Sequence, residues 1–158
     1  MNLSHYNQFN LFGADMIYKK ILDSNELCAT LQREIVPLIK DSNFEEMYKG
    51  GGRPPISPRV LLLTTIMQYL ERLSDRQAAM SLKYRLDWKI AFGLPVDFKG
   101  IHHTTFVYFR DRLIESEKSS YAFDKILEHL VVIGLAKKKC INAMALKERF
   151  RVLSEGKD

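Results

Sequence analysis

The chain has 158 residues, of which 46% are hydrophobic and 27% are charged. This size predicts one compact core with room for an appended helical arm. The formal net charge of +5 favours an acidic partner such as nucleic acid or an anionic membrane surface. Two distant cysteines, Cys28 and Cys140, are too few for a disulfide framework or a four-ligand zinc site. No stretch approaches the roughly 20 apolar residues that span a bilayer, so we expect a soluble, cytoplasmic protein with no membrane partner.

The first part of the chain is predicted to form a helical arm. Residues 1–12 are polar and aromatic without a sustained period, which is typical of a segment that orders only against something else. Apolar residues then recur every three or four positions over 16–21 and 27–38. This pattern predicts two helices, the second capped by Ser24 and ending near Lys40.

A linker is predicted over residues 41–52. The segment is polar and ends in Gly50, Gly51 and Gly52. This glycine run lacks the Lys-Ser/Thr of a phosphate-binding loop, so it is typical of a hinge. Three prolines follow by position 58 and exclude a helix until just before Arg59.

Two helices are predicted after this linker. The first begins at Arg59 and buries one broad face of the run VLLLTTIMQYLERL. The second opens with a capping box, in which the Ser74 hydroxyl accepts from the Gln77 amide and the Gln77 side chain reaches back to Ser74. Its inner face is formed by small and apolar residues, Ala78, Ala79 and Leu82. The small alanines allow the close approach that the first helix of a helix-turn-helix pair needs.

The next elements are a core anchor and a helix with two different faces. Trp88 lies in a short apolar segment that ends at the stop signal Gly93-Leu94-Pro95, so we expect it in the core. A helix over 104–115 is capped by His103 or Thr104. Its inward residues are Phe106, Phe109 and Leu113, and its other residues include Tyr108, Arg110, Asp111 and Arg112. A last helix opens at Ser119 or Ser120 and ends at Gly134.

The order of these elements carries a specific resemblance. The segments GRPPISPRVLLLTTIMQYLERLSDRQAAMSLKYRLDWKIAFGL and HHTTFVYFRDRL together resemble the N-terminal, InsH-like helical domain of bacterial insertion-sequence transposases, which precedes a DDE catalytic core. The resemblance covers residues 50–115. It implies an all-α domain that contains a helix-turn-helix, with flanking N- and C-terminal helices. We accordingly expect a helical arm (1–49), the transposase-like domain (50–135) and a divergent basic tail (136–158).

The resemblance also implies that the partner is double-stranded DNA, namely the terminal inverted repeat of an insertion sequence. Residues 104–115 would be the recognition helix, and the protein would associate with the nucleoid. The side chains expected to contact DNA are Arg53, Arg59, Arg76, Thr104, Thr105, Tyr108, Arg110 and Arg112. Because the three apolar side chains of this helix share one face, we expect Arg110 and Arg112 to lie off the buried face.

Catalysis is not expected from this chain. The family continues into a strand that carries the first catalytic aspartate, whereas this chain continues as KKKCINAMALKERFRVLSEGKD, with no aspartate between Asp124 and Asp158. Two-metal phosphoryl transfer needs carboxylates that converge on ions about 3.5–4 Å apart. We therefore expect a truncated or remnant transposase without cofactors, since magnesium would be needed only by a complete DDE transposase.

Two other interpretations of the function are open. The apolar helices over 15–40 and 120–134 could pair with a full-length transposase, or with a second copy of the chain, and inhibit transposition with little DNA affinity. Alternatively, the chain could be the N-terminal part of an active transposase that is completed by frameshifting. A metal site is not predicted, because His102 and His103 point to different sides of the backbone and no partner ligand is evident.

Overall fold

The structure is a computed structural model that describes residues 19–21, 23, 26–48 and 56–134. These residues form helices and no strands, which confirms the predicted all-α class. The elements are α2 (Glu26–Thr30), the π-helical turn η2 (Leu31–Ile35), the 3-10 turns η3 (Val36–Leu38) and η4 (Asp41–Tyr48), and the helices α3 (Pro58–Glu71), α4 (Asp75–Tyr84), α5 (Leu86–Phe92), α6 (Thr104–Glu115) and α7 (Glu117–Val132). None of the described helices is long and apolar enough to cross a membrane.

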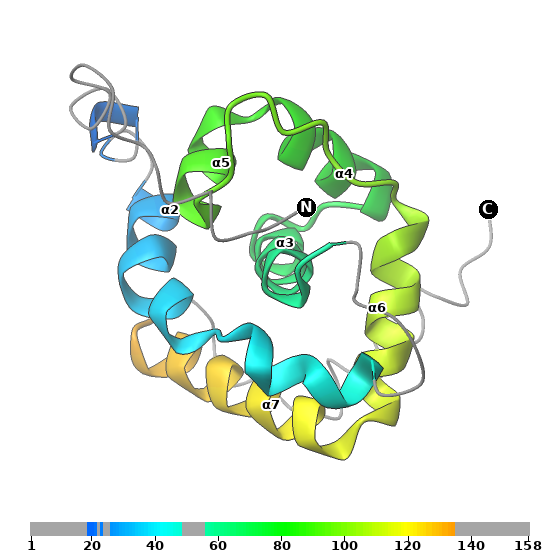
Figure 1. Cartoon of the computed structure of the whole chain (residues 1–158). Coiled ribbons are helices and arrows are strands. Elements are labelled where there is room, and N and C mark those ends of the chain that lie inside the picture. The colour runs from blue at the N-terminus through cyan, green and yellow to red at the C-terminus, as the bar shows by residue number, and fades with distance from the viewer. Residues whose placement is uncertain (1–18, 22, 24–25, 49–55, 135–158) are drawn as a thin grey trace.

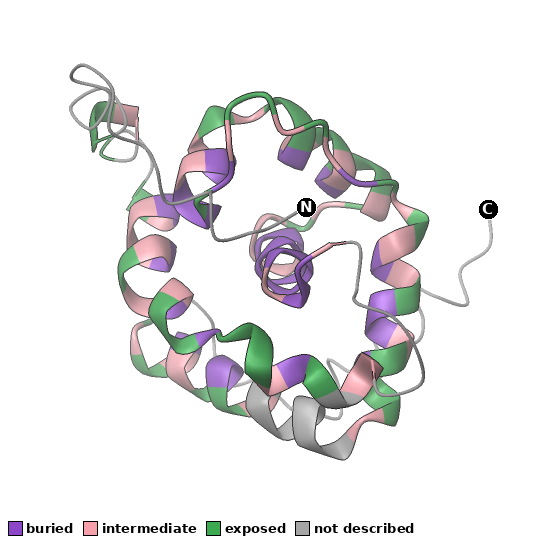
Figure 2. Ribbon diagram, in the orientation of Figure 1, coloured by how far each residue is buried: buried purple, intermediate pink, exposed green. Residues whose placement is uncertain are grey.

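Helix α3 lies at the centre of the molecule, and the other described helices surround it (Figure 1). Every residue from Val60 to Gln68 is buried (Figure 2). The helix is therefore covered on all sides, and not only on the one broad face that its sequence predicts. Two threonines fit this apolar environment because the hydroxyls of Thr64 and Thr65 donate to the carbonyls one turn earlier, each at 2.8 Å.

Both ends of α3 are fixed by specific contacts. Pro58 lies in its first turn, where the missing N–H costs nothing. The Asp41 carboxylate of η4 accepts from the Ser57 hydroxyl at 2.7 Å and from the Arg59 backbone N–H at 3.1 Å. At the other end Arg72 adopts the left-handed conformation, with φ of 56°. This conformation costs a non-glycine residue about 1–2 kcal/mol.

The predicted linker over residues 41–52 is wrong for its first part. Residues Asp41–Tyr48 form η4, which packs against α7, α3 and α6. Phe44 is fully buried. One aromatic side chain thus anchors a segment whose other residues are mostly polar. Because the segment is polar overall, its composition does not predict that it packs against the core. The predicted hinge at residues 50–52 and the predicted cap Ser24 lie outside the described residues.

The N-terminal helices differ in regularity from the prediction. Residues 16–18 of the first predicted helix, over 16–21, lie outside the described residues, and residues 19–21 are helical. The second ends at Leu38, close to the predicted Lys40, which confirms this boundary. Its last two turns are irregular, because the chain passes through the π-helical turn η2 and then a 3-10 turn that contains Pro37. Proline has no N–H for a regular helical hydrogen bond.

The predicted start of α4 is confirmed in atomic detail. The Ser74 N–H donates to the Gln77 side-chain oxygen at 2.8 Å, and the Gln77 N–H donates to the Ser74 hydroxyl at 3.3 Å. Ala78 and Leu82 are buried and Ala79 is half-buried, as expected for the inner face. The capping box therefore sets the boundary of α4 from local sequence alone.

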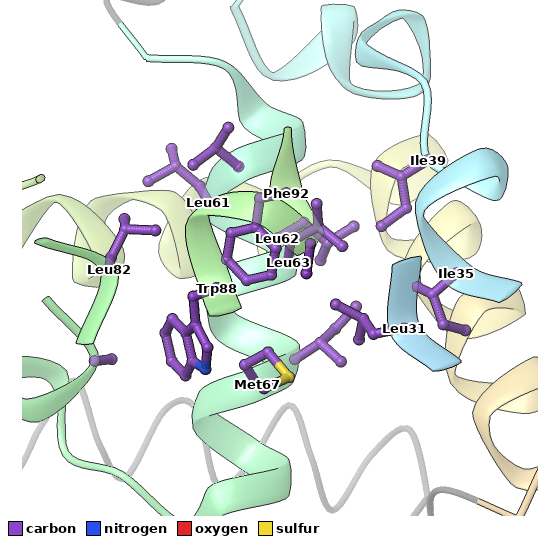
Figure 3. Close-up of a cluster of buried hydrophobic side chains, with 14 of the residues drawn as sticks. Leu31, Ile35, Ile39, Leu61, Leu62, Leu63, Met67, Leu82, Trp88 and Phe92 are labelled. Carbon is purple, nitrogen blue, oxygen red and sulfur yellow. The ribbon is translucent and has the colours of Figure 1, made fainter. Parts of the chain in front are cut away.

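One core joins the early and late parts of the described chain. Trp88 is fully buried, as predicted, and Gly93 ends α5 with φ of 69°. In Figure 3, Leu31 and Ile35 lie on one side of α3, and Trp88 and Leu82 lie on the other. The predicted division of the chain at residues 49 and 50 stays a prediction, but described residues on both sides of it contribute to this single core.

Helix α7 begins earlier than predicted. It starts at Glu117, so Ser119 and Ser120 lie inside the helix and are not its first residues. The reason is the short connection: Ser116 has an extended backbone that ends α6, and α7 begins at the next residue. The predicted end is confirmed, because the chain leaves α7 just before Gly134, which has φ of 75°.

Candidate nucleic-acid interface

Helix α6 has a buried face and an exposed face. Phe106, Phe109 and Leu113 are buried, as their spacing predicts. Thr104, Tyr108 and Arg112 are exposed, and Tyr108 retains 65% of its accessible surface. Residues four positions apart lie one above another along a helix. These three side chains therefore form a continuous line, here called the α6 ridge, while Thr105 beside it is half-buried.

The prediction for Arg110 is wrong. Its side chain is fully buried, with 0% exposure, and does not lie off the buried face with Arg112. Its two terminal nitrogens donate to the two carboxylate oxygens of Asp75 in α4, at 2.8 and 2.7 Å. Such a paired arrangement is the strong form of an ion pair, and it compensates the loss of water around the guanidinium. Arg110 is therefore held inside the domain and is not on its surface.

Asp75 joins three helices. Besides the two bonds from Arg110 of α6, its carboxylate accepts from the Gln68 side-chain amide of α3 at 2.7 Å. Burial alone would raise the pKa of Asp75, but the hydrogen bonds from Arg110 and Gln68 outweigh it and hold the pKa below its ordinary value. The charged carboxylate is thus the stable form, and it fixes α6 relative to α3 and α4.

The first turn of α6 is capped differently from the prediction. Neither His103 nor Thr104 forms the expected side-chain cap, since His103 precedes the helix without a capping hydrogen bond. Instead the His102 Nδ1 accepts from the Thr104 N–H at 3.4 Å and lies 2.8 Å from the Thr104 hydroxyl. The His102 and His103 rings lie close together, with centroids 4.2 Å apart and planes tilted by 38°, so the prediction that they point to different sides of the backbone is wrong. The two histidines therefore shape the start of the α6 ridge.

Arg112 is exposed but not isolated. Its guanidinium carbon lies over the ring of Tyr48 in η4, 5.3 Å from the ring centroid. Burial raises the pKa of the Tyr48 hydroxyl, and Arg112 partly opposes this shift. This contact restricts the conformations of the Arg112 side chain, which remains exposed to solvent. The sequence gives no local signal for this contact, because the two residues are far apart in the chain.

The remaining predicted DNA contacts do not all lie together. Arg76 is exposed in the first turn of α4, directly after Asp75, whose carboxylate binds Arg110 of α6. Arg59 is half-buried in the first turn of α3, whose far end leads to α4. A helix of 14 residues is about 20 Å long, so the length of α3 separates the region of Arg59 from that of Arg76. Arg53 lies outside the described residues.

A second ion-pair network lies at the start of α5. The Arg85 guanidinium donates to Glu71 and to both oxygens of Asp87, at 2.6 and 3.1 Å for Asp87. Glu71 also accepts from the Trp88 indole N–H at 3.3 Å. Burial and the nearby Asp87 raise the pKa of the Cys28 thiol to about 12, so this thiol stays protonated and donates to Asp87. The network fixes α5, and the bonds from Arg85 and Trp88 hold the Glu71 carboxylate toward α5.

The predicted helix-turn-helix stays a prediction. In the simple form of this motif, a turn of three or four residues joins the two helices. Here residues 85–103 separate α4 from α6, and they include the whole of α5. The two helices are nevertheless linked directly by the Asp75–Arg110 ion pair.

These features define an all-α domain in which a central buried helix supports a two-faced surface helix. The family model described as "Transposase domain (DUF772)" matches residues 16–112, more than half of the chain. The chain therefore belongs to this transposase domain family, which confirms the relationship that its sequence predicts. The match extends from the N-terminal helices to Arg112, so it includes the α6 ridge. No curated protein and no solved structure matches the chain.

Proposed function

We propose that this domain binds double-stranded DNA through the α6 ridge and holds the terminal inverted repeat of an insertion sequence. One observation carries the proposal: α6 uses one face for the core and leaves Thr104, Tyr108 and Arg112 exposed along the other. A single helix with an exposed polar face is the element that enters a major groove in many DNA-binding proteins. Membership of a transposase family and the net charge of +5 support the same partner.

Each side chain of the ridge has a suitable chemistry. Arg112 can donate two parallel hydrogen bonds to a phosphate or to a guanine edge. The hydroxyls of Thr104 and Tyr108 can donate to phosphate oxygens or contact base edges. Arg110 supports them from inside, because its bonds to Asp75 fix the helix on which they lie. In this proposal Arg110 is a positioning residue, and the proposal assigns no catalytic step to the described residues.

A binding measurement on a duplex library tests this proposal. A labelled duplex with a random central segment is enriched on the purified protein, and the selected duplex is then titrated by fluorescence anisotropy at several salt concentrations. The triple variant Thr104→Ala, Tyr108→Ala, Arg112→Ala should keep its fold, because all three side chains are exposed. It should lose at least about tenfold in affinity if one bidentate base contact disappears.

Lys125→Ala is the matched control for this experiment. Lys125 is an exposed cation on α7, with a side chain that is 57% exposed and a surface ion pair to Glu128. Its removal should leave the affinity for the selected duplex nearly unchanged. Equal affinity of the wild type and the folded ridge variant would remove α6 from the DNA interface and contradict the proposal.

The alternative role in pairing with a full-length transposase has less support among the described residues. That interpretation uses the apolar faces of the helices over 15–40 and 120–134. In the described part of these helices, most of the large apolar side chains are already buried in the chain's own core, while Leu38 and Val132 are exposed; the buried ones are Cys28, Leu31, Ile35, Ile126, Leu127 and Leu130. A partner would have to displace these contacts, so we do not base a function on these faces.

A further inference from the structure

The turn between α3 and α4 separates its charges by sign. Its two acids, Glu71 and Asp75, are half-buried and bonded inward, to Arg85 and to Arg110 respectively. Its two arginines, Arg72 and Arg76, are exposed. Among the described residues, neither exposed arginine forms an ion pair. The outer side of this turn therefore presents the positive charges of Arg72 and Arg76. The nearby carboxylates of Glu71 and Asp75 are already paired with other arginines.

Arg72 is an unusual residue for its backbone conformation. It is the one described residue other than glycine with a positive φ, at 56°, and it closes α3 in the left-handed region. Glycine adopts this conformation without strain and is the usual residue there. Among the described residues, the exposed Arg72 side chain forms no hydrogen bond or ion pair that would compensate the strain. An arginine in such a position points to a role for its side chain outside the fold.

The turn is rigidly connected to α6. Asp75 lies between Arg72 and Arg76 in sequence and forms two hydrogen bonds with Arg110 in the middle of α6. The pair is buried on the Arg110 side, so the turn cannot move far without breaking it. Whatever binds the exposed arginines is thereby held at a fixed distance from the α6 ridge.

We propose that Arg72, together with Arg76, binds phosphate groups on the DNA strand that borders the groove occupied by α6. This inference rests on the proposed DNA binding and adds a second anchoring point, at the α3–α4 turn. Arginine suits the role because its planar guanidinium can donate two hydrogen bonds to one phosphate. Contacts to phosphates set the position and register of a protein on the duplex without reading its sequence. The turn anchors the backbone, and the α6 ridge reads the groove.

The decisive variant is Arg72→Gly, because it separates the fold from binding. Glycine removes the charge and also relieves the left-handed strain, so the melting temperature should be unchanged or higher. Loss of one phosphate contact should lower the slope of log affinity against log salt by about 0.9 and weaken binding about 5- to 10-fold at 0.1 M salt. Because the contact is to the backbone, the loss should be equal for a selected and for a scrambled duplex.

Two further variants of the chain serve as controls for this experiment. Arg72→Lys keeps the charge and should retain most of the salt slope, and Lys125→Ala removes a cation from α7 and should retain all of it. An unchanged slope in Arg72→Gly, with normal binding by the wild type, overturns the phosphate contact but leaves the α6 ridge proposal intact. A loss in Arg72→Lys as large as in Arg72→Gly also overturns it, because charge would then not be the cause. Absence of DNA binding by the wild type at low salt overturns both proposals.

Discussion

Helices α3 and α6 both contribute to the core, but they divide their residues differently. In α3 every position from Val60 to Gln68 is buried, so each side chain there serves the fold. In α6 buried and exposed positions alternate along the helix, and Phe109 and Tyr108 are neighbours with opposite surroundings. The difference shows where this domain can carry function. A helix that is covered on all sides, such as α3, can only support other elements. A helix with one exposed face, such as α6, can also bind a partner.

The largest expected effect separates the neighbouring residues of α6. Phe109→Ala removes a buried ring and should lower the free energy of unfolding by about 3–5 kcal/mol. Tyr108→Ala removes a ring that is 65% exposed and should change it by less than about 0.5 kcal/mol. In α3 the neighbours Leu62→Ala and Leu63→Ala should both cost about 2–5 kcal/mol. Urea denaturation of the four variants measures this contrast, and a large loss in Tyr108→Ala would show that α6 is covered on both faces.

A somewhat smaller effect is expected at the two arginines of α6. Arg110→Ala leaves the Asp75 carboxylate with Gln68 but without its ion-pair partner. Breaking a buried pair costs about 3–5 kcal/mol, and we expect the lower end, since the Asp75 side chain is 17% exposed. Arg112→Ala removes only a surface stack on Tyr48 and should cost less than about 1 kcal/mol. Thermal melts of the two variants compare them, and equal small losses would argue against the buried pair.

The smallest effect is a pH dependence that arises from Asp75. Its pKa in the folded state lies below the ordinary value of 3.8, because the bonds from Arg110 and Gln68 outweigh burial. The stability from this carboxylate is therefore fully present above pH 3.8 and is lost as the pH falls below that value through the folded pKa. Asp75→Asn lacks this titration. The difference in unfolding free energy between wild type and variant should shrink below pH 3.8, and a constant difference would contradict the assignment.

Features that depend on neighbouring residues could be predicted from the sequence. The capping box of Ser74 and Gln77 involves residues three apart, and it occurs as predicted. The inner face of α6 follows from helical spacing, and Gly93 ends α5 because glycine tolerates a positive φ. In each case the determining interaction lies within one or two helical turns, where the sequence pattern and the structure have the same period.

Features that depend on distant partners could not be predicted. Helical spacing alone places Arg110 next to the buried face of α6. Burial of its side chain is favourable because of Asp75, which lies 35 positions earlier in the chain. The helical turn η4 packs against α7, α3 and α6, with Phe44 fully buried, and α6 and α7 lie far from it in sequence. The contact between Arg112 and Tyr48 has the same origin. For the candidate interface, the sequence therefore identifies the helix but does not identify which of its charges reach the surface.

The contact of Asp41 with the start of α3 limits how this chain can be shortened. Its carboxylate holds the Ser57 hydroxyl and the Arg59 N–H, so the central helix is completed by a residue that lies before residue 50. A fragment that begins at residue 50 would lose residues 16–49 of the match to the transposase domain family. It would also lack Asp41, Phe44 and the buried side chains of η2, which cover α3. A protein that contains this domain with a folded α6 would therefore also need its N-terminal helices.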